Sequence, residues 1–303
     1  MNDKSNVTVP AGKALPLGLL AIVGFSGTVP ATRLAVRELD PCFVAIARAV
    51  GAGLLAALFL LWQRAPLPAR RQLGAFALVA LGTVVGFPLL MAWAVTQVPA
   101  AEAAMMLAFI PLFTALCGTL QAGERPAPAF WCANALGLGA VLWFANSGPR
   151  SLQLGHAALL LACVLCALGY TAGGRLAQHM PGLNVVSWAL VLCLPLLAPL
   201  LAFWGPLPRL GQAHAATWIG LGYVTLISMF LAFAPWYAAL ARGGIALTSQ
   251  LQLLQPLLSV CWAAWLLGEA TSARLWITLA IVLLAIVWSR KAPRRAWALA
   301  RAH

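Results

Sequence analysis

The sequence predicts an all-α integral membrane protein, and three observations support that prediction. Hydrophobic residues make up 63% of the 303 residues and charged residues 8%, with a mean hydropathy of +0.92, which lies far outside the soluble globular range. The apolar residues fall into ten runs of about 20 residues, the length that an α-helix needs to cross a bilayer. The two halves of the chain also resemble each other at one constant spacing. We therefore expect ten transmembrane helices in two five-helix repeats.

The runs are separated by short breaks that contain Pro, Gly or several charged residues, all of which end helices. The expected spans cover residues 15–35, 41–63, 72–96, 101–121, 128–146, 155–176, 183–204, 213–240, 245–267 and 273–290. The chain then divides into a cytoplasmic N-terminal tail, a first repeat, a linker, a second repeat and a basic cytoplasmic C-terminal tail, at 1–14, 15–146, 147–154, 155–290 and 291–303.

The repeat has a spacing of 145 residues. Between residues 111 and 143, nine of the 33 positions are identical to the position 145 residues later. The identities include Pro111 with Pro256, and a Gly-Glu pair at 123–124 that recurs at 268–269. Leu and Ala match by chance in apolar helices, so the Pro and Gly-Glu matches at a single spacing indicate a duplicated half.

The distribution of basic residues predicts the orientation. With the N-terminus in the cytoplasm, thirteen Lys and Arg fall in inside segments and five in outside segments. This excess favours both termini on the cytoplasmic side of the inner, or plasma, membrane. Because each half has an odd number of spans, the two repeats are then inserted with opposite orientation, which is an inverted-topology repeat.

The composition argues against several other classes of function. The net charge of +13 arises from bases between apolar runs, where they orient helices, so we expect no nucleic-acid partner. Cys163 and Cys166 lie one helical turn apart, but no His, Asp or Glu is near them to complete a metal site, and no nucleophile is paired with a base at membrane depth. We expect no enzyme activity, no cofactor and no metal. The expected partners are a small-molecule substrate and the lipid bilayer; the oligomeric state stays open, and a monomer is plausible.

The ninth span carries polar side chains at helical spacing on an otherwise apolar helix. Thr248, Gln252, Gln255 and Ser259 recur at i, i+4, i+7 and i+11, which places them on one face, called the polar stripe below. Such groups cannot face lipid without losing their hydrogen-bond partners. The polar stripe either lines a cavity for solute or ties helices together, as amides often do in membrane bundles.

Several motifs along the chain are similar to those of one known family. They are GFSGTVPATRLAV in the first span, Pro41 and Arg48 in the pattern P-x6-R, the P-L…G-E ends of the fourth and ninth spans, and the Gly and Trp residues of the fifth and tenth spans. With these motifs the chain resembles the EamA branch of the drug/metabolite transporter superfamily. The resemblance implies ten helices around a central cavity, lined by the third, fourth, eighth and ninth helices and gated by the first and sixth. Many such proteins export metabolites, amino acids or drugs.

Aromatic and amide residues of the third and eighth spans are further candidates for substrate binding. Trp93 and Gln97 lie one turn apart, and Tyr237 shares a face with Phe230 and Phe233. An aromatic face beside an amide suits a flat apolar side chain. Aromatic residues near the end of a span also serve as interface anchors, which is the alternative for these residues and for Trp236.

Two further groups of residues are candidates for gating. Small and hydroxyl-bearing residues occupy equivalent positions in the two repeats, with Ser26 in the first span, and Tyr170 and Thr171 in the sixth. They allow either sliding or close packing of helices. Pro111 and Pro256 each free a backbone carbonyl one turn earlier, at residues 107 and 252, and a freed carbonyl can accept a hydrogen bond from an ammonium group. The alternative is a kink that serves packing alone.

The ionisable residues bear on energy coupling. Arg48 lies about 10 Å into its helix and is expected to be structural, either snorkelling outward or pairing with a carbonyl of the first helix. No Asp or Glu occupies the middle of a span, whereas proton-driven carriers usually titrate a carboxylate or His there. We therefore expect a carrier that is not strictly coupled to protons.

Together these residues predict an exporter of small neutral or zwitterionic metabolites that works by alternating access. The amide and aromatic candidates fit amino acids best, including aromatic ones. A multidrug, cation or nucleoside efflux carrier is the alternative, although a cation carrier would need a carboxylate in mid-membrane.

Overall fold

The computed structural model describes residues 14–145, 154–202, 213–267 and 273–291, and these segments consist of helices joined by short turns and loops, without a strand. The first half contains α1 Ala14–Ser26, α2 Thr28–Ala35, α3 Pro41–Gln63, the 3-10 helix η2 Arg70–Gln72, α4 Leu73–Val79, the π-helix η3 Ala80–Gly86, α5 Phe87–Gln97, α6 Ala100–Met106, α7 Phe109–Ala122 and α8 Pro128–Ala145. The second half contains α9 Leu154–Leu176, α10 Gly182–Ala202, α11 Ala215–Tyr223, the π-helix η5 Val224–Leu231, α12 Phe233–Gly243, α13 Ile245–Ser249, the 3-10 helix η6 Gln250–Leu253, α14 Leu254–Leu267 and α15 Ala273–Lys291.

The all-α prediction is confirmed, and within the described residues seven helical stretches are long and apolar enough to cross a membrane. They are formed by α1 with α2, by α3, by η2 to α5, by α6 with α7, by α9, by α10, and by α11 to α12. Two shorter apolar helices, Pro128–Trp143 and Trp276–Ser289, lie at the expected fifth and tenth spans. The count of ten spans stays a prediction, as do the boundaries of the repeats. The tails and the linker lie almost wholly outside the described residues.

The helix boundaries follow the 145-residue spacing. Adding 145 to the first residue of α7, Phe109, gives Leu254, where α14 begins. The same shift moves η3 from 80–86 to 225–231, which lies inside η5. A π-helix is rare and usually confined to one turn. Two of them at equivalent positions therefore support the equivalence of these two segments.

Side-chain contacts explain where α1 ends and where α3 begins. Asp40 caps α3: its carboxylate accepts hydrogen bonds from the backbone N–H groups of Cys42 and Phe43 at 2.8 and 3.0 Å. Between α1 and α2 the helix is interrupted at Gly27, where the ring of Tyr223 occupies the space of a side chain. The Tyr223 hydroxyl donates to the Gly24 carbonyl oxygen at 2.9 Å and fixes this break against α11.

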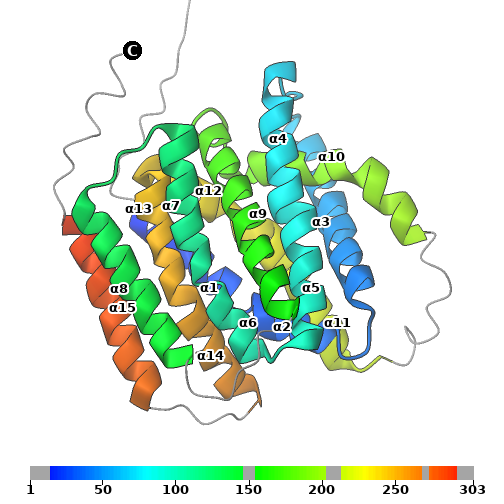
Figure 1. Ribbon diagram of the computed structural model, residues 1–303. Coiled ribbons are helices and arrows are strands. Elements are labelled where there is room, and N and C mark those ends of the chain that lie inside the picture. Colours follow the sequence, from blue (N-terminus) through cyan, green and yellow to red (C-terminus); the bar gives the residue numbers. More distant parts are fainter. Residues whose placement is uncertain (1–13, 146–153, 203–212, 268–272, 292–303) are drawn as a thin grey trace, which may run out of the picture.

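The helices pack around α9, which contacts α5 and α7 (Figure 1). α8 and α15 form a pair at one edge of the bundle, and α3 packs on α10 at the other. α1 lies against α12 and α14 in the interior. The largest buried cluster therefore lies between α1, α5, α9 and α12, with Ile22, Met91, Cys166 and Trp236 among its members.

Candidate functional site

A small cavity of about 20 Å³ lies inside this cluster. A volume of this size holds about one water molecule, so binding of a metabolite requires the surrounding helices to move apart. The lining combines one cation, three hydroxyl side chains, one amide, aromatic rings and a thiol. The eleven residues are Phe25, Thr28, Arg48, Thr83, Phe87, Ile110, Cys166, Tyr170, Ser228, Phe233 and Gln255. A larger hollow of about 270 Å³ beside Trp262 and Trp265 is almost wholly apolar and carries no comparable chemistry.

The lining residues follow the internal spacing of the sequence. Six of the eleven form three pairs that are 145 positions apart: Phe25 with Tyr170, Thr83 with Ser228, and Ile110 with Gln255. The cation has no such match, because the position 145 residues after Arg48 is Cys193. The cavity is thus lined by three pairs of equivalent positions, but its one charged side chain comes from the first half of the chain.

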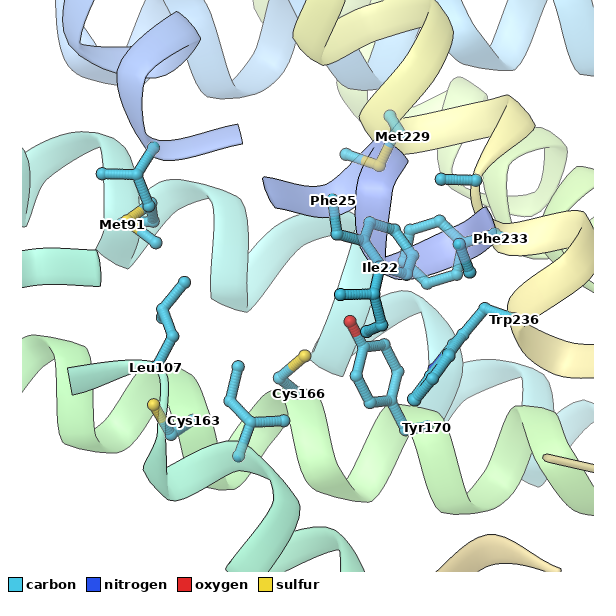
Figure 2. Packing of buried hydrophobic residues seen from close by; sticks show 14 of the residues in the cluster. Ile22, Phe25, Met91, Leu107, Cys163, Cys166, Tyr170, Met229, Phe233 and Trp236 are labelled. Atoms are coloured by element: carbon cyan, nitrogen blue, oxygen red, sulfur yellow. The ribbon is translucent and has the colours of Figure 1, made fainter. Parts of the chain in front are cut away.

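Aromatic rings from three helices form a cluster, and three of them, Phe25, Tyr170 and Phe233, line the cavity as its aromatic wall. The Phe25 and Phe233 ring centroids are 5.0 Å apart, those of Tyr170 and Trp236 are 5.3 Å apart, and those of Phe233 and Tyr237 are 5.3 Å apart. Figure 2 shows four of these rings around Ile22, with the Tyr170 hydroxyl pointing away from Trp236 towards Cys166 and Phe25. Rings in edge and offset contact provide a flat, rigid and apolar surface.

Several polar atoms behind this wall are buried without a hydrogen-bond partner. They include both amide atoms of Gln252, the Tyr237 hydroxyl and the Trp236 indole nitrogen. The Gln252 side chain lies close to the Tyr170 hydroxyl. Each such group costs about 1–3 kcal/mol in this conformation, so an arriving polar ligand is favoured if it provides the missing partner.

The residues of the polar stripe divide between contacts that join helices and the lining of the cavity. The Ser259 hydroxyl donates to the Ser26 carbonyl oxygen at 2.6 Å, and the Thr248 hydroxyl donates to the Ala239 carbonyl oxygen at 3.3 Å, so these two residues tie helices together. Gln255 lines the cavity, and its amide nitrogen lies 3.5 Å from the Phe25 carbonyl oxygen.

Arg48 differs from the expectation that it snorkels outward or pairs with a carbonyl of the first helix. Its side chain is only 3% exposed, and a terminal nitrogen donates to the Ser228 hydroxyl at 3.2 Å. Ser228 also shares a hydrogen bond of 2.8 Å with the Thr28 hydroxyl. Because α3 packs against both α10 and η5, this face of α3 meets protein and not lipid. Sequence analysis missed this interior position of Arg48.

The proline positions break their helices, but the structure corrects the expected free carbonyl before Pro111. The Leu107 carbonyl oxygen accepts a hydrogen bond from the Ile110 N–H at 3.0 Å, so a 3-10 turn uses it. The Pro111 carbonyl oxygen itself accepts from the Ser249 hydroxyl at 3.2 Å. The 3-10 helix η6 precedes Pro256 in the same way.

The aromatic and amide candidates divide into two groups. Tyr237 and Trp236 are fully buried, and Trp236 is therefore not the interface anchor that the sequence analysis allowed. Trp93 is 37% exposed and Gln97 is also exposed, with its amide 3.1 Å from the Thr96 hydroxyl, so neither reaches the cavity.

The gating candidates and Phe230 show how local geometry redirects side chains. The Ser26 hydroxyl accepts from the Trp262 indole N–H at 2.8 Å, whereas the buried Thr171 hydroxyl has no partner.

Phe230 packs on Phe59 instead of joining the aromatic wall. The π-helix η5 changes the angular phase of the helix before Phe233, which the sequence pattern did not reveal.

Two carboxylates outside the apolar stretches tie helix ends together. Glu38, after α2, contacts the side chain of His214 and the hydroxyl of Thr217, and accepts from the His214 backbone N–H at 2.8 Å. The hydrogen bond from Thr217, followed by those from His214, lowers the Glu38 pKa from 4.5 to about 2. Glu124, after α7, accepts from the first two backbone N–H groups of α13, both at 2.7 Å.

Comparison with known protein families identifies the chain. The model of the EamA-like transporter family matches two segments, residues 12–146 and 153–290. The chain belongs to the EamA-like transporter family. The members of this family are membrane transporters.

Relatives of this EamA-like transporter cover most of its length. It is 44% identical over 253 residues to the Bacillus subtilis (strain 168) protein named "Uncharacterized transporter YdeK", covering 83% of this chain and 88% of the relative. It is 26% identical over 267 residues to the "Probable terminal-alkyne amino-acid exporter" of Streptantibioticus cattleyicolor, covering 85% of this chain and 86% of that protein. The "Uncharacterized inner membrane transporter YedA" of Escherichia coli (strain K12) is 26% identical over 257 residues, covering 84% and 83%.

A crystal structure of another protein has the same fold as this EamA-like transporter. The two structures superpose with a TM-score of 0.76, covering 92% of this chain and 99% of the other. Their sequences are 20% identical, so the likeness concerns the fold alone.

Proposed function

We propose that this EamA-like transporter exports small neutral or zwitterionic metabolites from the cell, with amino acids, including aromatic ones, as its substrates. The observation that carries the proposal is the cavity, whose lining combines aromatic rings with Gln255 and several hydroxyl groups. Amide and hydroxyl groups hydrogen-bond the polar end of an amino acid, while flat rings accept its side chain. The name of the Streptantibioticus relative, a probable amino-acid exporter, supports the same class of solute.

The proposed transport unit has ten spans in two inverted five-helix repeats, 15–146 and 155–290, in the inner membrane with both termini in the cytoplasm. Three features support this proposal: the helix bounds that recur after 145 residues, the three paired positions in the cavity, and the two matches of one family model. Transporters of this design bind solute where the repeats meet and open alternately to each side. Solute entry then widens the small cavity by moving helices apart.

An efflux assay tests the substrate class. Proteoliposomes are loaded with labelled phenylalanine, leucine or serine, and efflux is compared between the native chain, Gln252→Leu with Gln255→Leu, and Gln97→Leu. The last variant makes the same amide-to-leucine change at an exposed position away from the cavity. Size-exclusion profiles verify that each variant is folded.

We expect efflux of several amino acids by the native chain and by Gln97→Leu, and loss of efflux in the double variant. Absence of amino-acid efflux from the native chain refutes the substrate class. Undiminished efflux by the double variant means that these amides only hold helices together.

A further inference from the structure

The buried guanidinium of Arg48 is the least compensated charge among the side chains that the structure describes. It is 3% exposed, it has one hydrogen bond, to Ser228, and its Nε atom has no partner. A guanidinium remains charged in a protein, and burying a charge without a counterion is costly. An ionisable side chain at this depth in a membrane protein therefore indicates a functional site.

The described carboxylates of the chain are engaged elsewhere. Glu38 contacts His214 and Thr217, Asp40 caps α3, and Glu124 caps α13. Each lies at the end of an apolar stretch, whereas Arg48 lies on the cavity wall. Among the side chains that the structure describes, no carboxylate forms an ion pair with Arg48, so none of them provides a counterion for the positive charge of the cavity.

The groups around Arg48 suit an anionic oxygen ligand. The Thr28 and Ser228 hydroxyls, 2.8 Å apart, line the same cavity and can donate to a carboxylate beside the guanidinium. The rings of Phe25, Tyr170 and Phe233, which contact one another, line the same cavity. A guanidinium binds a carboxylate through two parallel N–H···O bonds, which sets the orientation of the bound molecule.

We propose that Arg48 binds the carboxylate of the transported solute, with Thr28 and Ser228 as supporting donors and the aromatic wall holding a flat side chain. The inference rests on the proposed function and specifies it, because the solute must carry a carboxylate. Since the lining contains no acidic side chain, the ammonium group of an amino acid contributes little to recognition. A deaminated acid then binds about as well as the amino acid, and a decarboxylated amine does not bind.

The test is equilibrium binding to the purified full-length chain, followed by intrinsic tryptophan fluorescence, with three probes. L-phenylalanine carries both charged groups, 3-phenylpropanoate carries only the carboxylate, and 2-phenylethylamine carries only the ammonium. The variants are Arg48→Gln, Arg48→Lys and the matched control Arg37→Gln, which removes an exposed arginine outside the cavity. Thermal unfolding of each variant verifies its fold.

For the native chain and Arg37→Gln, we expect binding of both carboxylates and no binding of the amine. Arg48→Gln should weaken binding of both carboxylates about 10- to 100-fold, the range for hydrogen bonds to a charged group. Arg48→Lys should fall between them, because lysine keeps the charge but loses the paired geometry.

Tight amine binding by the native chain overturns the inference, as does unchanged phenylalanine binding in Arg48→Gln; in both cases, amino-acid export itself stands. If the native chain binds none of the probes and moves no amino acid, the proposed function and the inference both fail. If Arg48→Gln does not fold, the inference is tested by the affinities of the three probes for the native chain and for Arg48→Lys. Weaker binding of both carboxylates by Arg48→Lys supports it, and equal binding by the two chains overturns it.

Discussion

A tight crossing between helices of the two halves predicts that Gly→Ala substitutions change stability in opposite directions at different positions. At this crossing, η3 meets α9 through Gly82 and Gly169. A Cβ atom on Gly82 would lie 2.9 Å from the Gly169 Cα atom and closer still to the Leu165 carbonyl oxygen. These are backbone atoms, which cannot rotate away, so Gly82→Ala must push two helices apart.

The magnitude follows from two opposing effects. Overpacking a close contact costs about 1–3 kcal/mol, whereas replacing Gly by Ala within a helix contributes up to about 1 kcal/mol of stability. Gly82→Ala should therefore destabilise the protein by about 1–2 kcal/mol. Gly139 in α8 is the matched control, because an added Cβ there meets no atom within 4 Å, and Gly139→Ala should be neutral or stabilising.

The assay is the midpoint temperature of unfolding in detergent, read as the fraction of protein that stays monodisperse by size-exclusion after heating. The expected order of midpoints is Gly139→Ala at or above native, and Gly82→Ala below native. Equal midpoints for the two variants would refute the close backbone crossing and, with it, the packing of η3 on α9.

Three further predictions concern single side chains. Because the Glu38 pKa is lowered from 4.5 to about 2, the contacts of Glu38 give stability that is fully present above about pH 4.5 and is lost as the pH falls towards 2. Glu38→Gln should remove this part of the acid dependence when unfolding midpoints are compared from pH 6 to 3. Glu124→Gln should lower the free energy of unfolding by about 1–3 kcal/mol, because the pair of charge-assisted hydrogen bonds to α13 is lost. Glu124→Asp, which keeps the charge, should restore part of this stability. Identical unfolding midpoints for the native chain and both variants would contradict the prediction. Tyr237→Phe should leave the unfolding midpoint unchanged or raise it, because the hydroxyl is buried without a partner, and a large decrease would mean that the hydroxyl is bonded.

The sequence predicts the apolar helices and the positions where they break, because both depend on local composition. Apolar runs give the spans, and Pro or charged residues end them. The 145-residue spacing also predicts the equivalence of α7 with α14, since a duplicated sequence folds locally in the same way. Gln255 could be found because a polar stripe on an apolar helix is visible without a structure.

The rest of the site depends on how each helix is rotated and how deeply it is packed. Arg48 resembled a snorkelling residue by its depth, and only the packing of α3 on η5 turns it to the interior. Phe230 left the aromatic wall because η5 is a π-helix, which shifts the phase of every following side chain. Thr83 and Ser228 could also have been found in the sequence, because hydroxyl residues at the repeat spacing indicate equivalent positions in the lining of one cavity.

The central claim is that solute occupies the cavity between the two halves, and Cys166 reports on it directly. Cys166 lines the cavity, whereas Cys132 is exposed on α8 and provides an internal reference. The measurement is the rate of N-ethylmaleimide labelling at each cysteine in proteoliposomes, quantified by mass spectrometry with and without L-phenylalanine. At ten times its half-saturating concentration, phenylalanine should slow labelling of Cys166 about tenfold and leave Cys132 unchanged. Equal labelling of Cys166 with and without phenylalanine, in protein that transports it, would contradict the claim.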